Sequence, residues 1–281
     1  MQETIAIIFD FDDTLAPDST SGLLARLGVD VPSFWKHSVQ PLIDAGWDPV
    51  PAYLFKMIEL SRDGAVAPIS EQVLREWGAS LPLHDGVTDI FNRMRTVARK
   101  INPRVSIEFY LISSGIEDVL RHTVIAGEFN DIWASSFAYD GDGRIHFPKR
   151  VVSFTDKTRY IFQIQKGLFG DEQRGKPFEV NRKIPETKLR VPLGHMIFVG
   201  DGYTDVPCFS LIRKGGGVAI GVYDTDHRDR WGRAWGFIED GRVSNLVPAE
   251  YGERTALSNS LVMAVESIAR RISLEAATYQ G

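Results

Sequence analysis

Two carboxylates that stand two residues apart are the first feature of this 281-residue sequence that is able to do chemistry. Asp10 and Asp12 directly follow the apolar run 4–9, so a turn after that run can aim both side chains at one atom. One carboxylate can attack a phosphorus atom as the nucleophile, while the other protonates the leaving oxygen and then deprotonates the hydrolytic water. The pair therefore predicts phosphoryl transfer through an aspartyl phosphate.

Three further polar clusters lie at the ends of other expected strands or at the start of an expected helix. They are Ser-Ser-Gly at 113–115, Asp-Lys-Thr at 156–158 and Gly-Asp-Gly-Tyr-Thr-Asp at 200–205. Open α/β sheets place their sites at the carboxyl ends of the strands, where these clusters are expected to meet. Carboxylates that converge there repel one another unless a cation neutralises them or some of them are protonated. Because the motifs offer oxygen donors and neither His nor Cys, Mg²⁺ is the expected cofactor.

Donor groups in the same clusters favour an anionic ligand. Lys157 carries a fixed positive charge, and Ser113 with the backbone N–H groups that open the next helix forms an anion site. The dipole disfavours a lysine in the first turn of a helix, so this placement supports a functional role for Lys157. A metal, a lysine and a helix N-terminus together predict a cradle for phosphate.

In this order the motifs resemble those of the haloacid dehalogenase superfamily, and most nearly those of its phosphoserine-phosphatase-like phosphatases. The resemblance covers residues 4–16 and 82–222. It implies that Asp10 is the nucleophile and that Asp12 is the general acid and base. It also implies that Mg²⁺ is bound by the side chains of Asp10 and Asp201 and by the backbone carbonyl of Asp12, while Asp205 orients metal-bound waters or Lys157. The residues implied to bind phosphate are Ser113, Ser114, Gly115 and Lys157. Thr14 and Gly202 are implied to support the motif loops.

The resemblance implies a Mg²⁺-dependent phosphomonoester hydrolase that acts on a small phosphorylated metabolite. Asp12 favours a phosphatase over a dehalogenase, because the dehalogenases of the family lack this acid. The alternatives are a phosphotransferase or phosphomutase that uses the same aspartyl phosphate, and a catalytically silent binding protein on the same fold. A silent relative is expected to have lost Asp10, Asp12 or a metal carboxylate, and this sequence retains all of them.

One position limits the prediction of the substrate. Phosphoserine phosphatases of this family carry a glutamate nine residues after the nucleophile, where it recognises the amino group of the substrate. This sequence has Ser19 at that position, with Asp18 beside it. The residues therefore predict a small phosphorylated metabolite without predicting phosphoserine itself.

The acid role of Asp12 has a consequence for the pH dependence of the reaction. A carboxyl group that donates a proton beside an anionic phosphate needs a raised pKa. The rate is therefore expected to fall at alkaline pH, as the acid form of Asp12 disappears. Measuring the rate of the chemical step from about pH 6 to 10 tests the assignment, and a flat profile would contradict it.

Hydrophobic patterning predicts the elements that position these residues. Helical periodicity occupies segments such as 87–97 and 160–168, and alternates with apolar runs that end in polar clusters. This alternation predicts an α/β fold with a doubly wound, Rossmann-like parallel sheet and right-handed crossovers. The strands of that sheet are expected at 4–9, 105–112, 132–137 and 195–199.

An insertion interrupts the first crossover of this sheet. Nearly a hundred residues separate the first two expected strands, whereas a crossover needs little more than one helix. We expect a helical cap domain over 18–81 and a discontinuous core over 1–17 and 82–281, hinged at 82–86. Such a cap closes over the site, excludes water and selects substrates. Its helical pieces are expected at 21–27, 31–44, 51–61 and 70–77.

Several other segments have local signatures. Asp-Gly steps at 140–143 predict a β-hairpin over 137–147, and the prolines of 171–192 indicate an irregular excursion. Ser114 and Glu117 fit a capping box for a helix over 116–124, which gives Ser114 a structural role and leaves its N–H as a phosphate donor. The C-terminal segment predicts an amphipathic helix whose apolar face packs on the core or, alternatively, forms a dimer contact; that face contains Leu257, Leu261, Val265, Ile268 and Ile272.

The composition excludes several classes of partner. A net charge of -5 gives no broad attraction to nucleic acid or to an anionic membrane, so neither is expected as a partner. The single Cys208 excludes an intramolecular disulfide and a multi-cysteine metal cluster, and favours a reducing compartment. The first residues contain neither a basic leader nor a long apolar stretch. We therefore expect a cytoplasmic enzyme, and no feature favours a particular oligomer.

Overall fold

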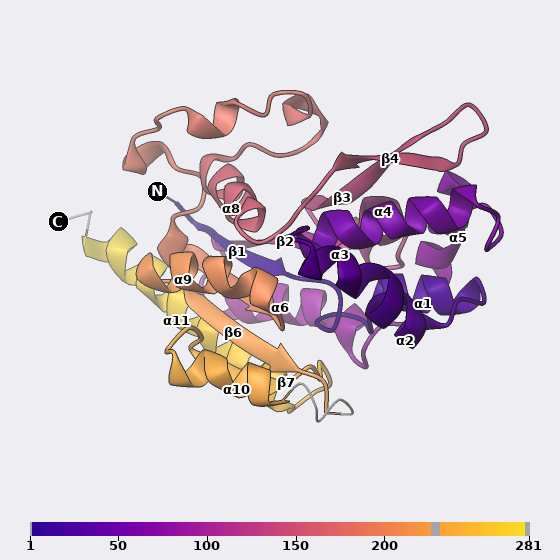
Figure 1. Ribbon diagram of the computed structural model, residues 1–281. Coiled ribbons are helices and arrows are strands. Elements are labelled where there is room, and N and C mark those ends of the chain that lie inside the picture. The colour runs from indigo at the N-terminus through magenta and orange to yellow at the C-terminus, as the bar shows by residue number, and fades with distance from the viewer. Residues whose placement is uncertain (1, 226–230, 279–281) are drawn as a thin grey trace.

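A seven-stranded sheet forms the centre of the protein (Figure 1). The computed structural model describes residues 2–225 and 231–278. The strands are β1 (Thr4–Phe9), β2 (Ser106–Ile116), β3 (Asp131–Tyr139), β4 (Ile145–Arg150), β5 (Met196–Gly200), β6 (Val218–Tyr223) and β7 (Asn245–Pro248). Their order in the sheet is β4-β3-β2-β1-β5-β6-β7, and only β3 and β4 pair antiparallel. The predicted α/β fold with a Rossmann-like sheet is confirmed.

Strand β1 lies in the middle of the sheet because its side chains are apolar on both faces. Ile5 to Phe9 are all buried, and β2 and β5 pair with β1 on its two sides. All four predicted strands are confirmed. Two further strands, β6 and β7, were not predicted, because Gly221 interrupts the short apolar run of β6 and β7 has only four residues.

Helices cover both faces of the sheet. Along β1, Ile7 packs in the cluster that contains α6 (Val87–Ile101) and α11 (Ala256–Thr278), whereas Ile8 packs in the opposite cluster. That second cluster contains residues of α8 (Asp156–Lys166), α9 (Val206–Lys214) and α10 (Trp231–Glu239). The sheet is therefore doubly wound, as its alternation of strand and helix predicts.

The apolar face of α11 packs inside the chain. Leu257, Leu261, Val265, Ile268 and Ile272 are at most 2 % exposed, and α11 packs mainly against α6. This confirms packing on the core as the use of that face and leaves none of these five side chains for a dimer contact. None of the helices within residues 2–225 and 231–278 combines the length and the apolar character that crossing a bilayer requires.

Helices occupy the insertion between β1 and α6. They are α1 (Ser19–Arg26), α2 (Val31–Ser33), the π-helical segment η1 (Phe34–Val39), α3 (Gln40–Asp44), α4 (Pro49–Arg62) and α5 (Glu71–Ser80). The single helix expected over 31–44 is divided into three pieces. The ring nitrogen of Pro41 has no hydrogen to donate, and at Gln40 the chain makes an i→i−5 bond to Trp35.

The β3–β4 hairpin lies beside α4 and α5, whereas the excursion after α8 lies next to α8 (Figure 1). The turn over 140–143 joins β3 to β4, and Gly143 adopts a positive φ of 75° there, as the Asp-Gly steps predict. The inserted helical segment contacts the hairpin through α4 and through a bridge between Ser70 and Arg144. Residues 171–192 form short 3₁₀ turns, which confirms an irregular excursion.

Candidate active site

The loop after β1 begins the site. The Asp10 N–H still bonds the carbonyl of Val199 in β5, at 2.9 Å, so Asp10 lies where the two strands end. Its Oδ1 accepts the Phe11 N–H at 2.7 Å. The chain then turns sharply at Asp13, whose φ of 53° is in the left-handed region that Asp tolerates better than most residues. This turn directs Asp10 and Asp12 to the carboxyl edge of the sheet.

Lys157 joins two of the predicted motifs. It lies in the first turn of α8 with a fully buried side chain, and its Nζ donates to Asp10 Oδ2 at 2.8 Å and to Asp205 Oδ1 at 2.7 Å. Burial by itself lowers the pKa of the Lys157 ammonium, but the charges of Asp10 and Asp205 outweigh burial and raise that pKa above its usual value. Lys157 therefore stays charged in the interior.

A third carboxylate, that of Asp201, faces the same point. Oxygens of Asp10, Asp201 and Asp205 lie within 4.8 Å of one another. Burial raises the pKa of Asp201 well above its usual range, and the charges of Asp205 and Asp10 raise it further. Among the described residues, no side chain or backbone N–H donates a hydrogen bond to Asp201. Three carboxylates with one lysine leave excess negative charge, and an oxygen-only donor set with such charge fits a hard divalent cation such as Mg²⁺.

Asp205 is held from two sides. In addition to Lys157, the Gly202 N–H donates to its Oδ2 at 3.0 Å. A Cβ added at Gly200 would lie 2.4 Å from that oxygen, so the end of β5 needs glycine for Asp205 to pack against it. Burial and the charge of Asp10 raise the pKa of Asp205 to about 7, although Lys157 opposes the shift. Asp205 thus positions Lys157 within the site.

Asp12 lies on the other side of Asp10. Its Oδ1 accepts the Ser19 N–H at 2.7 Å, from the start of α1. Burial, reinforced by the charge of Asp18, raises the pKa of Asp12 to about 8. The direction is the one that an acid at neutral pH requires. The Asp12 side chain is not among the three carboxylates that could share a metal, so its predicted metal contact through the backbone carbonyl stays a prediction.

Gly115 brings β2 against Asp12. A Cβ at this position would lie 2.7 Å from Asp12 Oδ2 and 3.2 Å from Ser113 Oγ. Ser113 is buried, and its Oγ accepts the Gly115 N–H at 3.0 Å. The predicted acid and the predicted phosphate-binding turn therefore lie side by side, and glycine is the residue that allows this approach.

Replacing Gly115 by alanine tests this close packing. We expect Gly115→Ala to displace Asp12 and to reduce the rate of phosphate-ester hydrolysis by about ten- to a hundredfold, because misplacing a reacting group by an ångström is that costly. Hydrolysis of p-nitrophenyl phosphate measures the effect. Gly127→Ala is the matched control, since a Cβ there meets no atom within 4 Å. Equal rates for both variants would show that Asp12 does not need this space.

Ser114 does not cap a helix, which corrects the prediction from its spacing to Glu117. Strand β2 continues to Ile116, and α7 (Glu117–Leu120) is a single turn without a side-chain cap. Glu117 instead bonds Arg121 and Arg150, and Ser114 Oγ is buried without a partner. The pattern failed because Glu117 finds two guanidinium groups, which bind a carboxylate more strongly than a backbone N–H does.

Two supporting residues act mainly through their backbones. Tyr251 Oη donates to the Thr14 carbonyl at 3.0 Å, while the Thr14 hydroxyl is buried without a partner. Gly202 contributes the N–H that holds Asp205. Both contacts hold the motif loops in position, although the Thr14 side chain plays no visible part.

Reasoning from the sequence missed the residues of the inserted helices that contact the site. Tyr53 Oη donates to the Ser114 carbonyl at 2.6 Å. Burial raises the pKa of the Tyr53 hydroxyl, and the charge of Asp12 contributes to the shift. The Trp77 indole N–H bonds the Ser19 carbonyl at 2.9 Å. No local pattern marks either residue, because each aromatic side chain also fits the apolar face of its helix.

Asp18 has a structural partner. Its Oδ1 accepts the Ser21 N–H at 2.8 Å, and its Oδ2 accepts the Ser21 hydroxyl at 3.0 Å, so Asp18 is the N-cap of α1. The side chain of Ser19 adds no carboxylate. Neither residue therefore supplies a free carboxylate where the amino-group-binding glutamate of phosphoserine phosphatases is expected.

Comparisons with known proteins agree with this arrangement. A family model for haloacid dehalogenase-like hydrolases matches residues 7–210, which include every predicted site residue. An uncharacterized protein of Borreliella burgdorferi is 26% identical over 284 residues, covering 92% of this chain and 95% of the relative.

Solved structures share the fold at low sequence identity. A haloacid dehalogenase family hydrolase from Salmonella enterica serovar Typhi superposes with a TM-score of 0.59 at 11% identity, covering 93% of this chain and 71% of that one. A phospho-aspartyl intermediate analogue of phosphoserine phosphatase gives a TM-score of 0.52 at 15% identity, covering 92% of this chain and 98% of that one. At these identities the likeness establishes the fold.

Proposed function

This chain belongs to the haloacid dehalogenase-like hydrolase family, and we propose that it is a Mg²⁺-dependent phosphatase that hydrolyses a small phosphorylated metabolite. One observation carries the proposal: buried Lys157 bridges Asp10 and Asp205, while Asp12 lies beside the Ser113 turn. This set combines a nucleophile, an acid and cationic phosphate binding at one edge of the sheet. Phosphate release from p-nitrophenyl phosphate in the presence of Mg²⁺ is the first test.

The reaction uses Asp10 and Asp12 in two steps. A carboxylate oxygen of Asp10 forms a bond to phosphorus as the bond to the leaving oxygen breaks, and that oxygen takes a proton from Asp12. A water molecule then attacks the phosphoryl group and gives a proton to Asp12. Inorganic phosphate leaves, and Asp10 is again a carboxylate. The raised pKa of Asp12, caused mainly by burial, supports the acid role in the first step.

Two residues bind the transferring group. Lys157 supplies a permanent positive charge, and Ser113 supplies a hydroxyl at the end of β2. Lys157 also fixes the orientation of the Asp10 carboxylate through its 2.8 Å hydrogen bond. Asp205 keeps Lys157 in place from the opposite side, so the ammonium group needs little rearrangement when phosphate binds.

The carboxylates of Asp10 and Asp201 and the backbone carbonyl of Asp12 would hold Mg²⁺, with Asp205 behind them. When bound, the ion supplies positive charge against the phosphate oxygens and lets an anionic nucleophile approach an anionic substrate. The excess negative charge of the three clustered carboxylates supports this assignment. Ser114 and Gly115 remain proposed phosphate ligands through their backbone N–H groups.

We propose that residues 18–81 act as a cap over a core of 1–17 and 82–281. Apolar packing of α4 against β4 and of α5 against α7 joins the two parts, and polar contacts add to it beside the site. They include the Tyr53 bond to Ser114, the Trp77 bond to Ser19 and a bond from Ser153 Oγ to Asp48 at 3.0 Å. Contacts of this kind can break and re-form as substrate enters.

Removing one of these contacts tests the cap. We expect Tyr53→Phe to raise KM for p-nitrophenyl phosphate by about two- to tenfold with a smaller change in kcat, because the lost bond holds the closed form. Steady-state kinetics separates the two constants. Tyr139→Phe is the matched control, since it removes a tyrosine hydroxyl bond to Asp118 outside the site. A loss of kcat with unchanged KM would instead assign Tyr53 to the chemical step.

The residues around the acid also bear on the substrate. Asp18 is the N-cap of α1, and Ser19 stands where the glutamate is expected. Neither position therefore offers a free carboxylate to the amino group of a substrate. We therefore propose a phosphorylated metabolite that is not recognised through an α-amino group there. A panel of phosphorylated amino acids, amino alcohols, sugars and nucleotides with Mg²⁺ identifies the class. Measuring free phosphate against transfer to added alcohols distinguishes hydrolysis from phosphotransfer.

A further inference from the structure

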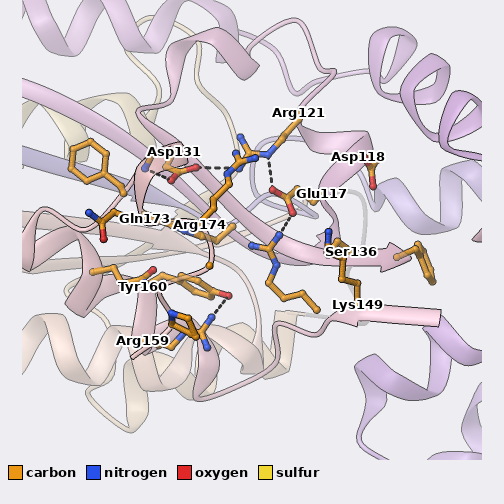
Figure 2. Close-up of a pocket in the computed structure, with 18 of the residues that line it drawn as sticks. Glu117, Asp118, Arg121, Asp131, Ser136, Lys149, Arg159, Tyr160, Gln173 and Arg174 are labelled. Atoms are coloured by element: carbon orange, nitrogen blue, oxygen red, sulfur yellow. Dashed lines mark hydrogen bonds and ion pairs between the residues drawn. The ribbon is translucent and has the colours of Figure 1, made fainter. Parts of the chain in front are cut away.

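A cavity lies outside the proposed active site. Its volume is about 960 Å³, and its walls come from β3, β4, α7, α8 and the start of the 171–192 excursion (Figure 2). None of the proposed catalytic, phosphate-binding or metal-binding residues lines it. The volume lies in the range of cavities that hold small-molecule ligands.

Three residues that line this cavity each carry a buried side-chain polar atom that has no hydrogen-bond partner within the described part of the chain. The atoms are Ser136 Oγ, Arg159 Nε and Gln163 Oε1. Ser136 is only 6% exposed and Gln163 only 9%. Leaving such groups unpaired costs free energy, so native proteins seldom collect them in one place without a ligand or water that pairs them. Their position around one cavity indicates a ligand-binding site.

The carboxylates of the cavity are already engaged. Glu117 bonds Arg121 and Arg150, and Figure 2 shows Arg121 lying between Glu117 and Asp131. Asp131 also accepts the Gly170 N–H at 2.8 Å. The remaining two are paired as well: Asp118 accepts from Tyr139, and Glu71 pairs with Arg75. The acidic side chains therefore offer little to a cationic ligand.

Two cations have no anionic partner. The Lys149 side chain in β4 makes no hydrogen bond or ion pair with any described residue. Arg159 donates only to the Tyr160 hydroxyl, at 2.9 Å, with its guanidinium 4.7 Å from the centre of that ring. Figure 2 shows both side chains at the cavity. The charged side chains that lack a partner at this cavity are therefore cations, which favours an anionic ligand.

The aromatic wall limits the shape of the ligand. Trp133 stacks between Tyr110 and Tyr160, with ring centres 5.8 Å and 5.2 Å away. Arg159 covers the Tyr160 ring in turn. Because protein groups already occupy these faces, a flat aromatic ligand has little to stack on there. A non-aromatic ligand that uses hydrogen bonds fits better.

We propose that this cavity binds a small, non-aromatic anionic metabolite that carries hydroxyl groups, either an organic phosphate or a hydroxycarboxylate. Arg159 and Lys149 receive the anionic group. Gln163 Oε1 accepts a hydrogen bond from a ligand hydroxyl, and Ser136 Oγ donates or accepts. The 171–192 excursion forms one wall of the cavity through residues such as Gln173 and Arg174.

Calorimetric titration with two probes tests the proposal. The probes are gluconate and ribose 5-phosphate, added without Mg²⁺ to protein that carries Asp10→Asn, so that no ester is turned over. We expect at least one probe to bind with a Kd below about 1 mM. Binding of gluconate alone identifies a carboxylate ligand, and binding of ribose 5-phosphate alone identifies a phosphate ligand. Failure of both probes at about 10 mM overturns the proposal.

Variants assign the binding to this cavity. Arg159→Gln is expected to weaken binding at least about tenfold, the usual loss for one charged hydrogen bond. Arg99→Gln, which removes an exposed cation from α6, is the charge-matched control. Ser136→Ala is expected to weaken binding while the ligand-free protein keeps its thermal midpoint, because its hydroxyl has no partner to lose.

One pattern of binding among these variants would contradict the proposal. Binding that survives Arg159→Gln but disappears in Ser113→Ala belongs to the hydrolytic site and overturns the proposal. These measurements follow binding rather than turnover, so their failure leaves the proposed phosphatase activity untouched. Loss of that activity in other tests likewise leaves the cavity proposal standing.

Discussion

Asp10→Asn is expected to reduce hydrolysis of p-nitrophenyl phosphate by about a thousandfold or more. The amide matches the shape of the carboxylate and can still accept the Phe11 N–H, but it has no anionic oxygen to attack phosphorus. It also removes one of the two carboxylates that bond Lys157. The loss should therefore appear in kcat, because the missing group acts in the chemical step.

A trapping experiment separates this role from simple binding. Acid quenching of wild-type protein with labelled p-nitrophenyl phosphate should capture a labelled acyl phosphate, and the Asp10→Asn protein should capture none. Asp89→Asn is the matched control, because Asp89 is an exposed residue in the first turn of α6. Wild-type-like turnover or labelling in Asp10→Asn would remove Asp10 from the mechanism.

Lys157→Met is expected to lower both activity and stability. Methionine keeps much of the length of the side chain but leaves Asp10 and Asp205 without their shared cation in the interior. Removing one partner of a buried ion pair typically costs about 3–5 kcal/mol in the free energy of unfolding. Loss of phosphate binding and of Asp10 orientation should reduce hydrolysis by at least about a hundredfold.

Chemical denaturation and steady-state kinetics measure the two effects. Lys100→Met removes an exposed lysine from the last turn of α6 and is expected to change neither quantity appreciably. If Lys157→Met unfolds too readily for kinetics, Lys157→Arg keeps the charge while placing it in a wider group. A Lys157→Met protein with the parent stability would contradict the buried pairing of Lys157 with both carboxylates.

Short-range patterns were enough to predict much of the fold. The run 4–9 is apolar at every position except Thr4, and a short run of this kind is typical of a strand that is buried on both faces. The Asp-Gly steps at 140–143 predicted the turn between β3 and β4 for a similar local reason. The prediction failed where a pattern was ambiguous: Ser114 and Glu117 matched a capping box, yet guanidinium groups brought in by the fold bind Glu117.

The sequence by itself determined which residue types are available for chemistry and the order of the four motifs, because both depend only on neighbours along the chain. The tertiary structure decided which of these residues touch. Lys157 and Asp10 are separated by 147 positions, and no local pattern predicts which carboxylates its ammonium will contact. The same holds for Tyr53, which comes from the cap segment to bond Ser114, and for the cavity between α8 and the hairpin. Contacts of this kind arise only when the sheet brings distant strand ends and helix starts to one edge, so their partners can be assigned only in the folded chain.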